Sequence, residues 1–216
     1  MIKRGFIALW TALLALPLVA VAGLQQETLA LARQWDHIHY QMAADDRAAA
    51  YEALATKAAA VAKAYPDAAE PRIWQAIALA SLAGEKGGLS ALGLVKRARK
   101  LLLAAERLNP EAMQGSVYVT LGSLYDQVPG WPISFGDRDK ARAYLERALR
   151  IAPDSMGANY FMADFLIRHK QYAAARGYLQ KVLAAPDLKQ RPVYSKGRKA
   201  EARQALARVE AKLARR

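Results

Sequence analysis

The histidines of this chain are the first residues to consider for chemistry, and their spacing does not suit a metal site. His37 and His39 are two positions apart, so on a helix they point about 200° apart. Two histidines that share a metal on one helix are instead four positions apart. His169 stands alone in a polar stretch. We therefore predict no metal site.

The closely spaced carboxylates are better explained as helix caps than as catalytic acids. Asp45 and Asp46 precede an apolar periodic segment, and Asp137 precedes another. The chain contains no cysteine and no recognisable nucleophile motif or phosphate-binding loop. We therefore predict a protein that is not an enzyme and that uses no cofactor.

The most unusual stretch is the loop VPGWPISFGD at 128–137. It places Trp131 and Phe135 among prolines and glycines, a composition typical of a stiff loop that displays aromatic side chains. One interpretation is that these two residues dock a partner or close a binding cleft. The other is that they fold back and plug the groove between helices, with Asp137 capping the next helix.

A second group of aromatic residues is expected on the first helices of neighbouring helical hairpins. These helices would line a concave apolar cleft for a small ligand or a peptide. Packing between the hairpins is the competing explanation. With the two loop aromatics, the candidate binding residues from these helices are Tyr118, Tyr125, Asn159, Tyr160 and Phe165.

These residues belong to a repeating pattern. Tyr118, Leu121-Gly122 and Tyr125 are followed by Ala141, Leu145, Ala148 and Pro153, an order that resembles the tetratricopeptide repeat of two antiparallel helices in about 34 residues. Similar landmarks stand on both sides of this unit. They are Ala175, Leu179, Val182 and Pro186 after it, Ala98, Leu102, Ala105 and Pro110 before it, and more loosely Leu54, Ala58, Val61 and Pro66.

The repeat predicts an all-α protein, a tetratricopeptide-like α-hairpin solenoid of about ten helices. Gly122 and Ala141 are small enough to let paired helices approach closely. Gly- and Pro-rich insertions at 83–90 and 128–137 account for the longer repeat spacings. After Pro186 we expect an extended segment at 191–195 and then a capping helix that covers the last repeat on one side and faces water on the other.

The N-terminus has the pattern of an export signal. A basic start, an apolar run from Phe6 to Leu16 and small residues at Ala20 and Ala22 predict a signal peptide at 1–22, cleaved after Ala22. An uncleaved membrane anchor is the alternative. We expect a periplasmic protein, with a repeat domain at 23–195 and a basic C-terminal capping helix at 196–216. No cysteine is available for lipid attachment after the signal.

The formal charge of +13 is unevenly distributed. Residues 187–216 hold ten basic and three acidic residues. This tail could contact an anionic membrane surface through its Lys and Arg side chains. Glu201 and Glu210 interrupt the basic run, which is more typical of a solvated helix. An exported protein would meet no nucleic acid, so we predict none as a partner.

Part of the chain resembles a specific family. The runs PGWPISFGD at 129–137 and ANYFMADFL at 158–166 are similar to the T-component family associated with tripartite ATP-independent periplasmic (TRAP) transporters. This resemblance implies a helical periplasmic protein that associates with a solute-binding subunit in organic-solute uptake, and it brings a homo-oligomer, a trimer, into consideration. The alternative function is a generic cell-envelope scaffold for protein interactions with no transport role.

Overall fold

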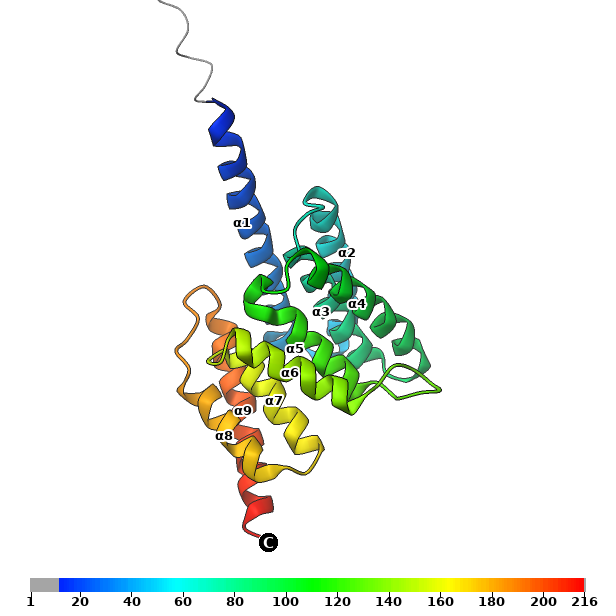
Figure 1. The fold of residues 1–216 in the computed structure, drawn as a ribbon, viewed down its shortest axis with the longest axis vertical. Coiled ribbons are helices and arrows are strands. Elements are labelled where there is room, and N and C mark those ends of the chain that lie inside the picture. Colours follow the sequence, from blue (N-terminus) through cyan, green and yellow to red (C-terminus); the bar gives the residue numbers. More distant parts are fainter. Residues whose placement is uncertain (1–11, 216) are drawn as a thin grey trace, which may run out of the picture.

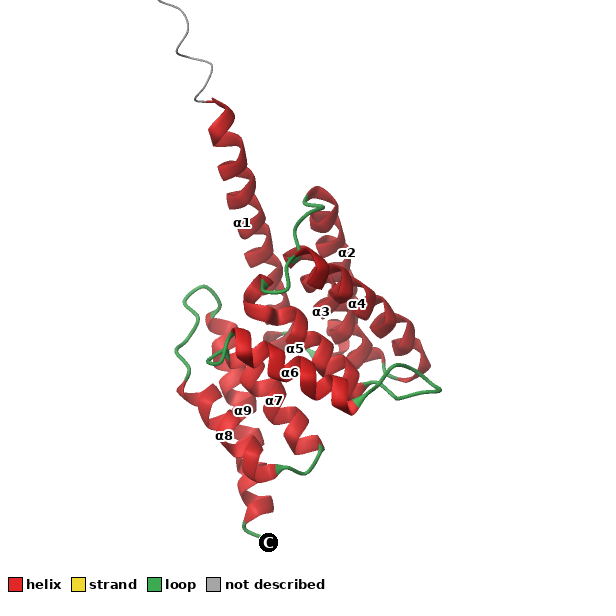
Figure 2. Ribbon diagram, in the orientation of Figure 1, coloured by secondary structure: helices red, strands yellow, loops and turns green. Residues whose placement is uncertain are grey.

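The computed structural model describes residues 12–215, and over this range the protein is built from helices joined by turns and loops (Figures 1 and 2). The nine helices of the described range compare with about ten predicted. They are α1 (Ala12–Gln41), α2 (Ala44–Ala64), α3 (Glu70–Lys86), α4 (Gly88–Leu108), α5 (Ala112–Gln127), α6 (Arg138–Ile151), α7 (Met156–Arg168), α8 (Tyr172–Ala184) and α9 (Pro192–Leu213).

Successive helices pack as hairpins, so the predicted all-α hairpin solenoid is confirmed. Helix α3 packs on α2 and α4, α5 packs on α6, α7 on α8, and α8 on α9. The helices fold where expected because the landmark residues form buried stripes. Ala98, Leu102 and Ala105 are buried on α4, and Ala141 and Leu145 are buried on α6.

Close approach of α5 and α6 depends on Gly122, as its position in the repeat predicts. A Cβ atom built on this glycine would lie 2.6 Å from Leu145 Cγ and 3.1 Å from the carbonyl oxygen of Ala141. Such a separation is well inside van der Waals contact. The small side chains therefore set the distance between the helices of this hairpin.

The predicted caps are partly right. Asp137 caps α6, because its Oδ1 accepts hydrogen bonds from the backbone N–H groups of Asp139 at 3.1 Å and Lys140 at 3.0 Å. Asp45 and Asp46 do not cap α2. That helix begins at Ala44, one residue before Asp45, so both carboxylates lie in its first turn. Their negative charge there interacts favourably with the positive end of the helix dipole.

The C-terminal region differs from the prediction in two ways. Helix α9 begins at Pro192, inside the segment 191–195 that we expected to be extended, because a proline fits the first turn of a helix. The second difference is that α9 packs on α7 and α8 with one side but also contacts α1. The contact with α1 was not predicted, whereas Arg203, Gln204, Ala207 and Arg208 are exposed as expected for the side that faces water.

The N-terminal helix is the longest in the described range and projects from the body at its start (Figure 1). The predicted signal cleavage after Ala22 falls within this helix, and the basic start of the predicted signal lies outside the described residues. From residue 12 to 215, no helix is both long enough and apolar enough to span a membrane.

Candidate groove of the helical solenoid

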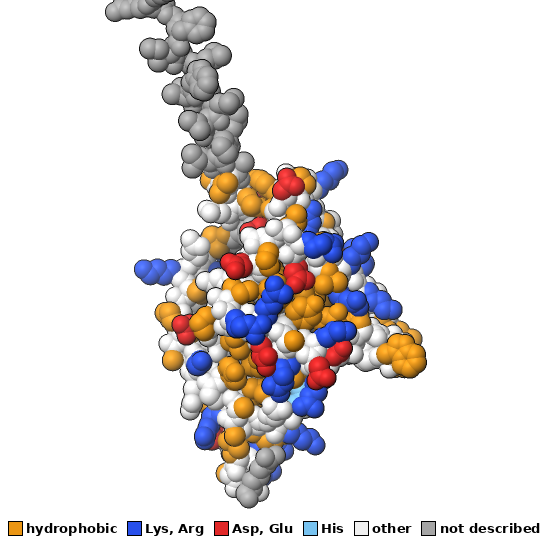
Figure 3. Space-filling model, in the orientation of Figure 1, with side chains coloured by type: hydrophobic (Ala, Val, Ile, Leu, Met, Phe, Trp, Pro, Cys, Tyr) orange, Lys and Arg blue, Asp and Glu red, His pale blue; other side chains and the backbone are white. Residues whose placement is uncertain are grey.

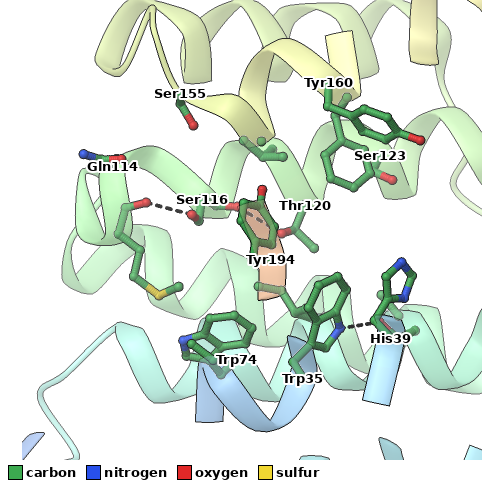
Figure 4. A pocket seen from close by; sticks show the side chains of 18 of the residues that line it. Trp35, His39, Trp74, Gln114, Ser116, Thr120, Ser123, Ser155, Tyr160 and Tyr194 are labelled. Atoms are coloured by element: carbon green, nitrogen blue, oxygen red, sulfur yellow. Dashed lines mark hydrogen bonds between the residues drawn. The ribbon is translucent and has the colours of Figure 1, made fainter. Parts of the chain in front are cut away.

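A large groove runs along the inner side of the helical stack, with a volume of about 2340 Å³. Its lining comes from α1, α3, α4, α5 and α7, and α9 also contributes. We call it the concave groove. Residues that define it in Figure 4 are Trp35, Trp74, Ser116, Thr120, Ser123, Tyr160 and Tyr194.

One wall of the concave groove is formed by two indole rings. Trp35 of α1 is fixed by a hydrogen bond from its Nε1 to Ser81 Oγ at 2.9 Å and by stacking on the His39 ring at 4.4 Å. Trp74 of α3 lies beside it in Figure 4. Its Nε1 is buried and has no hydrogen-bond partner within the described part of the chain. The wall is thus apolar, and the Trp74 N–H is enclosed within it.

The facing wall carries a row of hydroxyl groups from α5. Ser116, Thr120 and Ser123 are spaced four and three residues apart, so they share one face of the helix. The opposite face of α5 carries Tyr118 and Leu121 into the core. Ser116 and Thr120 donate to backbone carbonyls of their own helix, at 2.7 Å and 3.0 Å. Their oxygens can therefore accept hydrogen bonds from a ligand.

The backbone at the start of α5 is unusual where it borders the groove. Met113 and Gln114 have φ values of 51° and 56°, and Gly115 follows at 73°. Left-handed conformations at non-glycine residues cost free energy, and they concentrate at binding sites. Both side chains line the concave groove. This strained turn therefore shapes one end of the site.

A buried arginine is set into the groove from α9. The guanidinium of Arg198 lies 4.2 Å from the ring centre of Tyr160 and 5.4 Å from that of Tyr194. Its Nη1 is 2.8 Å from Glu201 Oε2. An arginine that is 4% exposed requires such partners, because an uncompensated buried charge is very unfavourable. The cluster therefore ties α7 to α9.

The two ends of the chain are joined across the groove by a set of contacts that we call the α1–α9 clasp. Arg191 donates two hydrogen bonds to the carboxylate of Asp36, with 3.0 Å between Nε and Oδ2. Tyr40 and His39 both reach Glu201, each at 3.3 Å. The clasp therefore links the first and last helices of the described range.

Electrostatics in the clasp favour ionised Glu201. Burial alone would raise the pKa of this carboxyl, but the hydrogen bond from His39 and the charge of Arg198 hold its pKa below the usual value. Burial raises the pKa of Tyr160, with the negative charge of Glu201 adding to the effect. At neutral pH the cluster therefore contains a carboxylate, a guanidinium and neutral phenols.

Four of the predicted binding residues lie in the core, which is the competing explanation given for them above. They pack between helices because they occupy the landmark positions of the repeat. Asn159 is also fixed by its own backbone, since its Nδ2 donates to the carbonyls of Pro153 and Ser155 at 2.8 and 2.9 Å. The four residues and their exposed fractions are Tyr118 (0%), Tyr125 (6%), Asn159 (1%) and Phe165 (1%).

The other three predicted residues lie in different surroundings. Tyr160 is half-buried and lines the concave groove. Phe135 packs on the Tyr125 ring at 5.2 Å and under the guanidinium of Arg99 at 4.7 Å. Trp131 is 90% exposed at the tip of its loop. The plug interpretation is therefore wrong for Trp131, whereas Phe135 does pack against the helices.

Sequence reasoning missed most of the groove residues. The hydroxyl row of α5 was detectable, because Ser116, Thr120 and Ser123 fall at helical spacing opposite the landmark face. The contributions of α1 and α9 were not detectable. Trp35 and Arg198 come from opposite ends of the chain, and no local pattern relates them. For metal binding, residues 12–215 contain no group of three or more acidic or histidine side chains placed to hold an ion.

Comparison with known proteins identifies a repeat in the second half of the chain. No curated protein matches the chain. The tetratricopeptide repeat family matches residues 133–188, which cover the second half of the Trp131 loop, α6, α7 and α8. The helices on either side of this match pack as further hairpins in the same succession. The chain therefore contains a tetratricopeptide-repeat region within an all-helical solenoid.

Proposed function

We propose that the protein is a non-enzymatic binding protein whose concave groove holds an extended segment of a partner protein. The size of the groove carries the proposal. Pockets for small molecules usually measure about 300–1000 Å³, whereas this groove measures about 2340 Å³. Helical-repeat proteins use extended concave surfaces of this kind for protein partners.

The chemistry of the two walls suits a peptide. Trp35 and Trp74 are 7% and 3% exposed and support one wall from behind. Ile77 and Leu92 line the groove and are only partly buried. These aliphatic side chains offer apolar contact area to a bound segment. Across from them, Ser116 and Thr120 offer hydroxyl oxygens that can accept hydrogen bonds from backbone N–H groups of the ligand. An extended peptide presents apolar side chains and N–H groups together, so it matches both walls.

A substitution that fills the groove tests this proposal. Ser123→Trp places an indole on the hydroxyl wall, and Thr56→Trp places the same group on the exposed face of α2, outside the groove. We expect the first variant to capture the partner at least tenfold more weakly and the second to behave as wild type. Capture is measured in intact cells by photo-cross-linking from position 116, a different residue of the hydroxyl row, in wild type and in both variants. Equal capture by both variants would contradict a groove-bound partner.

The partner that we propose is the solute-binding protein of a transporter. The resemblance of 129–137 and 158–166 to the T-component family supports a periplasmic location and association with the solute-binding protein of a TRAP transporter. An affinity pull-down from the periplasm, with the protein at its natural level, is expected to recover such a protein. Recovery of other envelope proteins alone would reject the transport role and leave the groove as a general scaffold.

A further inference from the structure

The tip of the loop at 128–137 projects from the molecule and is apolar. Trp131 is 90% exposed and Ile133 is 59% exposed, which makes them two of the few large hydrophobic side chains exposed in the described part of the chain. Residues 128–136 contain no ionisable side chain. In Figure 1 the loop extends away from the helices beyond the α5–α6 hairpin.

The loop is held in a fixed shape although its tip is exposed. The two ends of the loop are joined by backbone hydrogen bonds. The Gly136 N–H donates to the carbonyl of Pro129, and the Asp137 N–H donates to the backbone carbonyl of Tyr125, each at 2.9 Å. A Cβ on Gly136 would lie 1.8 Å from the Val128 carbonyl oxygen, so only glycine fits this neck. A rigid neck presents the tip without a large loss of conformational entropy on binding.

A row of basic residues lies beside the base of the loop, and we call it the α4 ledge: Lys96, Arg97, Arg99 and Lys100. The guanidinium of Arg99 covers the Phe135 ring, which places the ledge against the loop. Lys96, Arg97 and Lys100 are exposed, and no described carboxylate lies within salt-bridge distance of them. The sequence from 86 to 105 contains no acidic residue. Figure 3 shows basic side chains along the edge from which the orange tip projects.

We propose that this loop inserts its Trp131–Ile133 tip into the interface of an anionic lipid membrane while the α4 ledge contacts the lipid phosphates. Tryptophan prefers the boundary between headgroups and acyl chains, and each nearby Lys or Arg adds attraction to an anionic surface. The tip has no charged side chain that could pair with a specific partner protein, whereas insertion into a lipid interface requires no such pairing. Trp131 and the α4 ledge lie outside the lining of the concave groove, although Ile133 also borders it. The basic C-terminal tail lies elsewhere in the chain.

Fluorescence quenching by lipids brominated on their acyl chains tests the proposal on the full chain. The protein used carries the substitution Trp10→Phe, which leaves three tryptophans. Trp131 is 90% exposed, whereas Trp35 and Trp74 are 7% and 3% exposed. We expect quenching by vesicles that contain phosphatidylglycerol and little by pure phosphatidylcholine. The additional change Trp131→Phe removes the quenching. The bromines report the tip itself even when the N-terminal segment also binds the vesicle.

Charge variants test the role of the ledge. Lys96→Gln with Lys100→Gln is expected to raise the lipid concentration for half-maximal quenching about 25-fold, roughly fivefold for each lysine. Lys57→Gln with Lys63→Gln makes the same charge change on exposed positions of α2 and serves as the matched control. Absence of quenching by anionic vesicles would overturn the proposal, even if Trp131 cross-linked to a protein. Equal quenching by neutral vesicles, or equal effects of the two charge variants, would overturn the role of the ledge.

Discussion

The α1–α9 clasp makes a sharp prediction about stability. The Asp36 side chain is 2% exposed and the Arg191 side chain is 19% exposed, and the guanidinium donates two hydrogen bonds to the carboxylate. Asp36→Asn keeps the shape of the side chain but removes its charge. The variant leaves a largely buried arginine facing a neutral amide that can accept through only one atom.

The size of the effect follows from this burial. Removing one partner of a buried ion pair costs about 3 kcal/mol or more. For a chain of this length, each 1 kcal/mol lowers the midpoint temperature by about 2–4 °C, so we expect a fall of roughly 6–12 °C. Differential scanning calorimetry measures this change. The double variant with Arg191→Gln should recover part of the loss, because it removes the unpaired charge.

An exposed ion pair supplies the control. Lys86 and Glu52 are 3.6 Å apart, with side chains that are 40% and 66% exposed. Surface pairs of this kind contribute at most about 1 kcal/mol, so Glu52→Gln should shift the midpoint by only a few degrees. A midpoint for Asp36→Asn that matches the Glu52→Gln variant would refute the argument that the clasp stabilises the helical stack.

Three further predictions follow from single side chains. Gly122→Ala should destabilise the protein by about 1–3 kcal/mol in urea unfolding, because its Cβ would overlap a leucine of α6, whereas Gly177→Ala, with open space around its Cα, should be neutral or stabilising. Trp131→Ala should leave the midpoint temperature within about 2 °C of wild type, because the indole is exposed. Phe135→Ala should lower the free energy of unfolding by roughly 1–2 kcal/mol, because this ring packs on Tyr125. Equal effects of the two variants would show that the loop tip is packed. The pKa of Glu201 is lowered in the folded protein from its ordinary 4.5, so its contribution is complete above that pH and is lost as the pH falls through the folded pKa. The stability difference between wild type and Glu201→Gln should therefore shrink in acid, and a difference that grew in acid would contradict this assignment.

The spacing of landmark residues was sufficient to predict the hairpins. A helix pair is stabilised by contacts between residues close in the sequence. Ala141 and Leu145 recur as Ala98 and Leu102 and as Ala175 and Leu179, because each pair needs the same close approach. Helix ends were less predictable. Pro192 begins α9, although Pro186 had suggested an extended connection there, because proline both ends helices and suits their first turn.

The candidate site was harder to predict than the fold. Tyr118 and Phe165 were expected to contact a ligand, but landmark residues of a repeat also build its core, and their spacing alone does not distinguish the two roles. In the structure the landmark face of α5 is buried, and the hydroxyl row of Ser116 and Thr120 borders the groove. Of the loop aromatics, Phe135 packs and Trp131 does not.

The sequence by itself determined the helices, their pairing and the stiff aromatic loop, because these depend on contacts within one or two repeats. Only the tertiary structure decided that the N-terminal helix meets the last one. Asp36 and Arg191 are 155 residues apart, and their meeting depends on the accumulated rotation of every hairpin between them. The groove exists because that rotation brings α1 and α9 together, so its walls could not be read from any one segment.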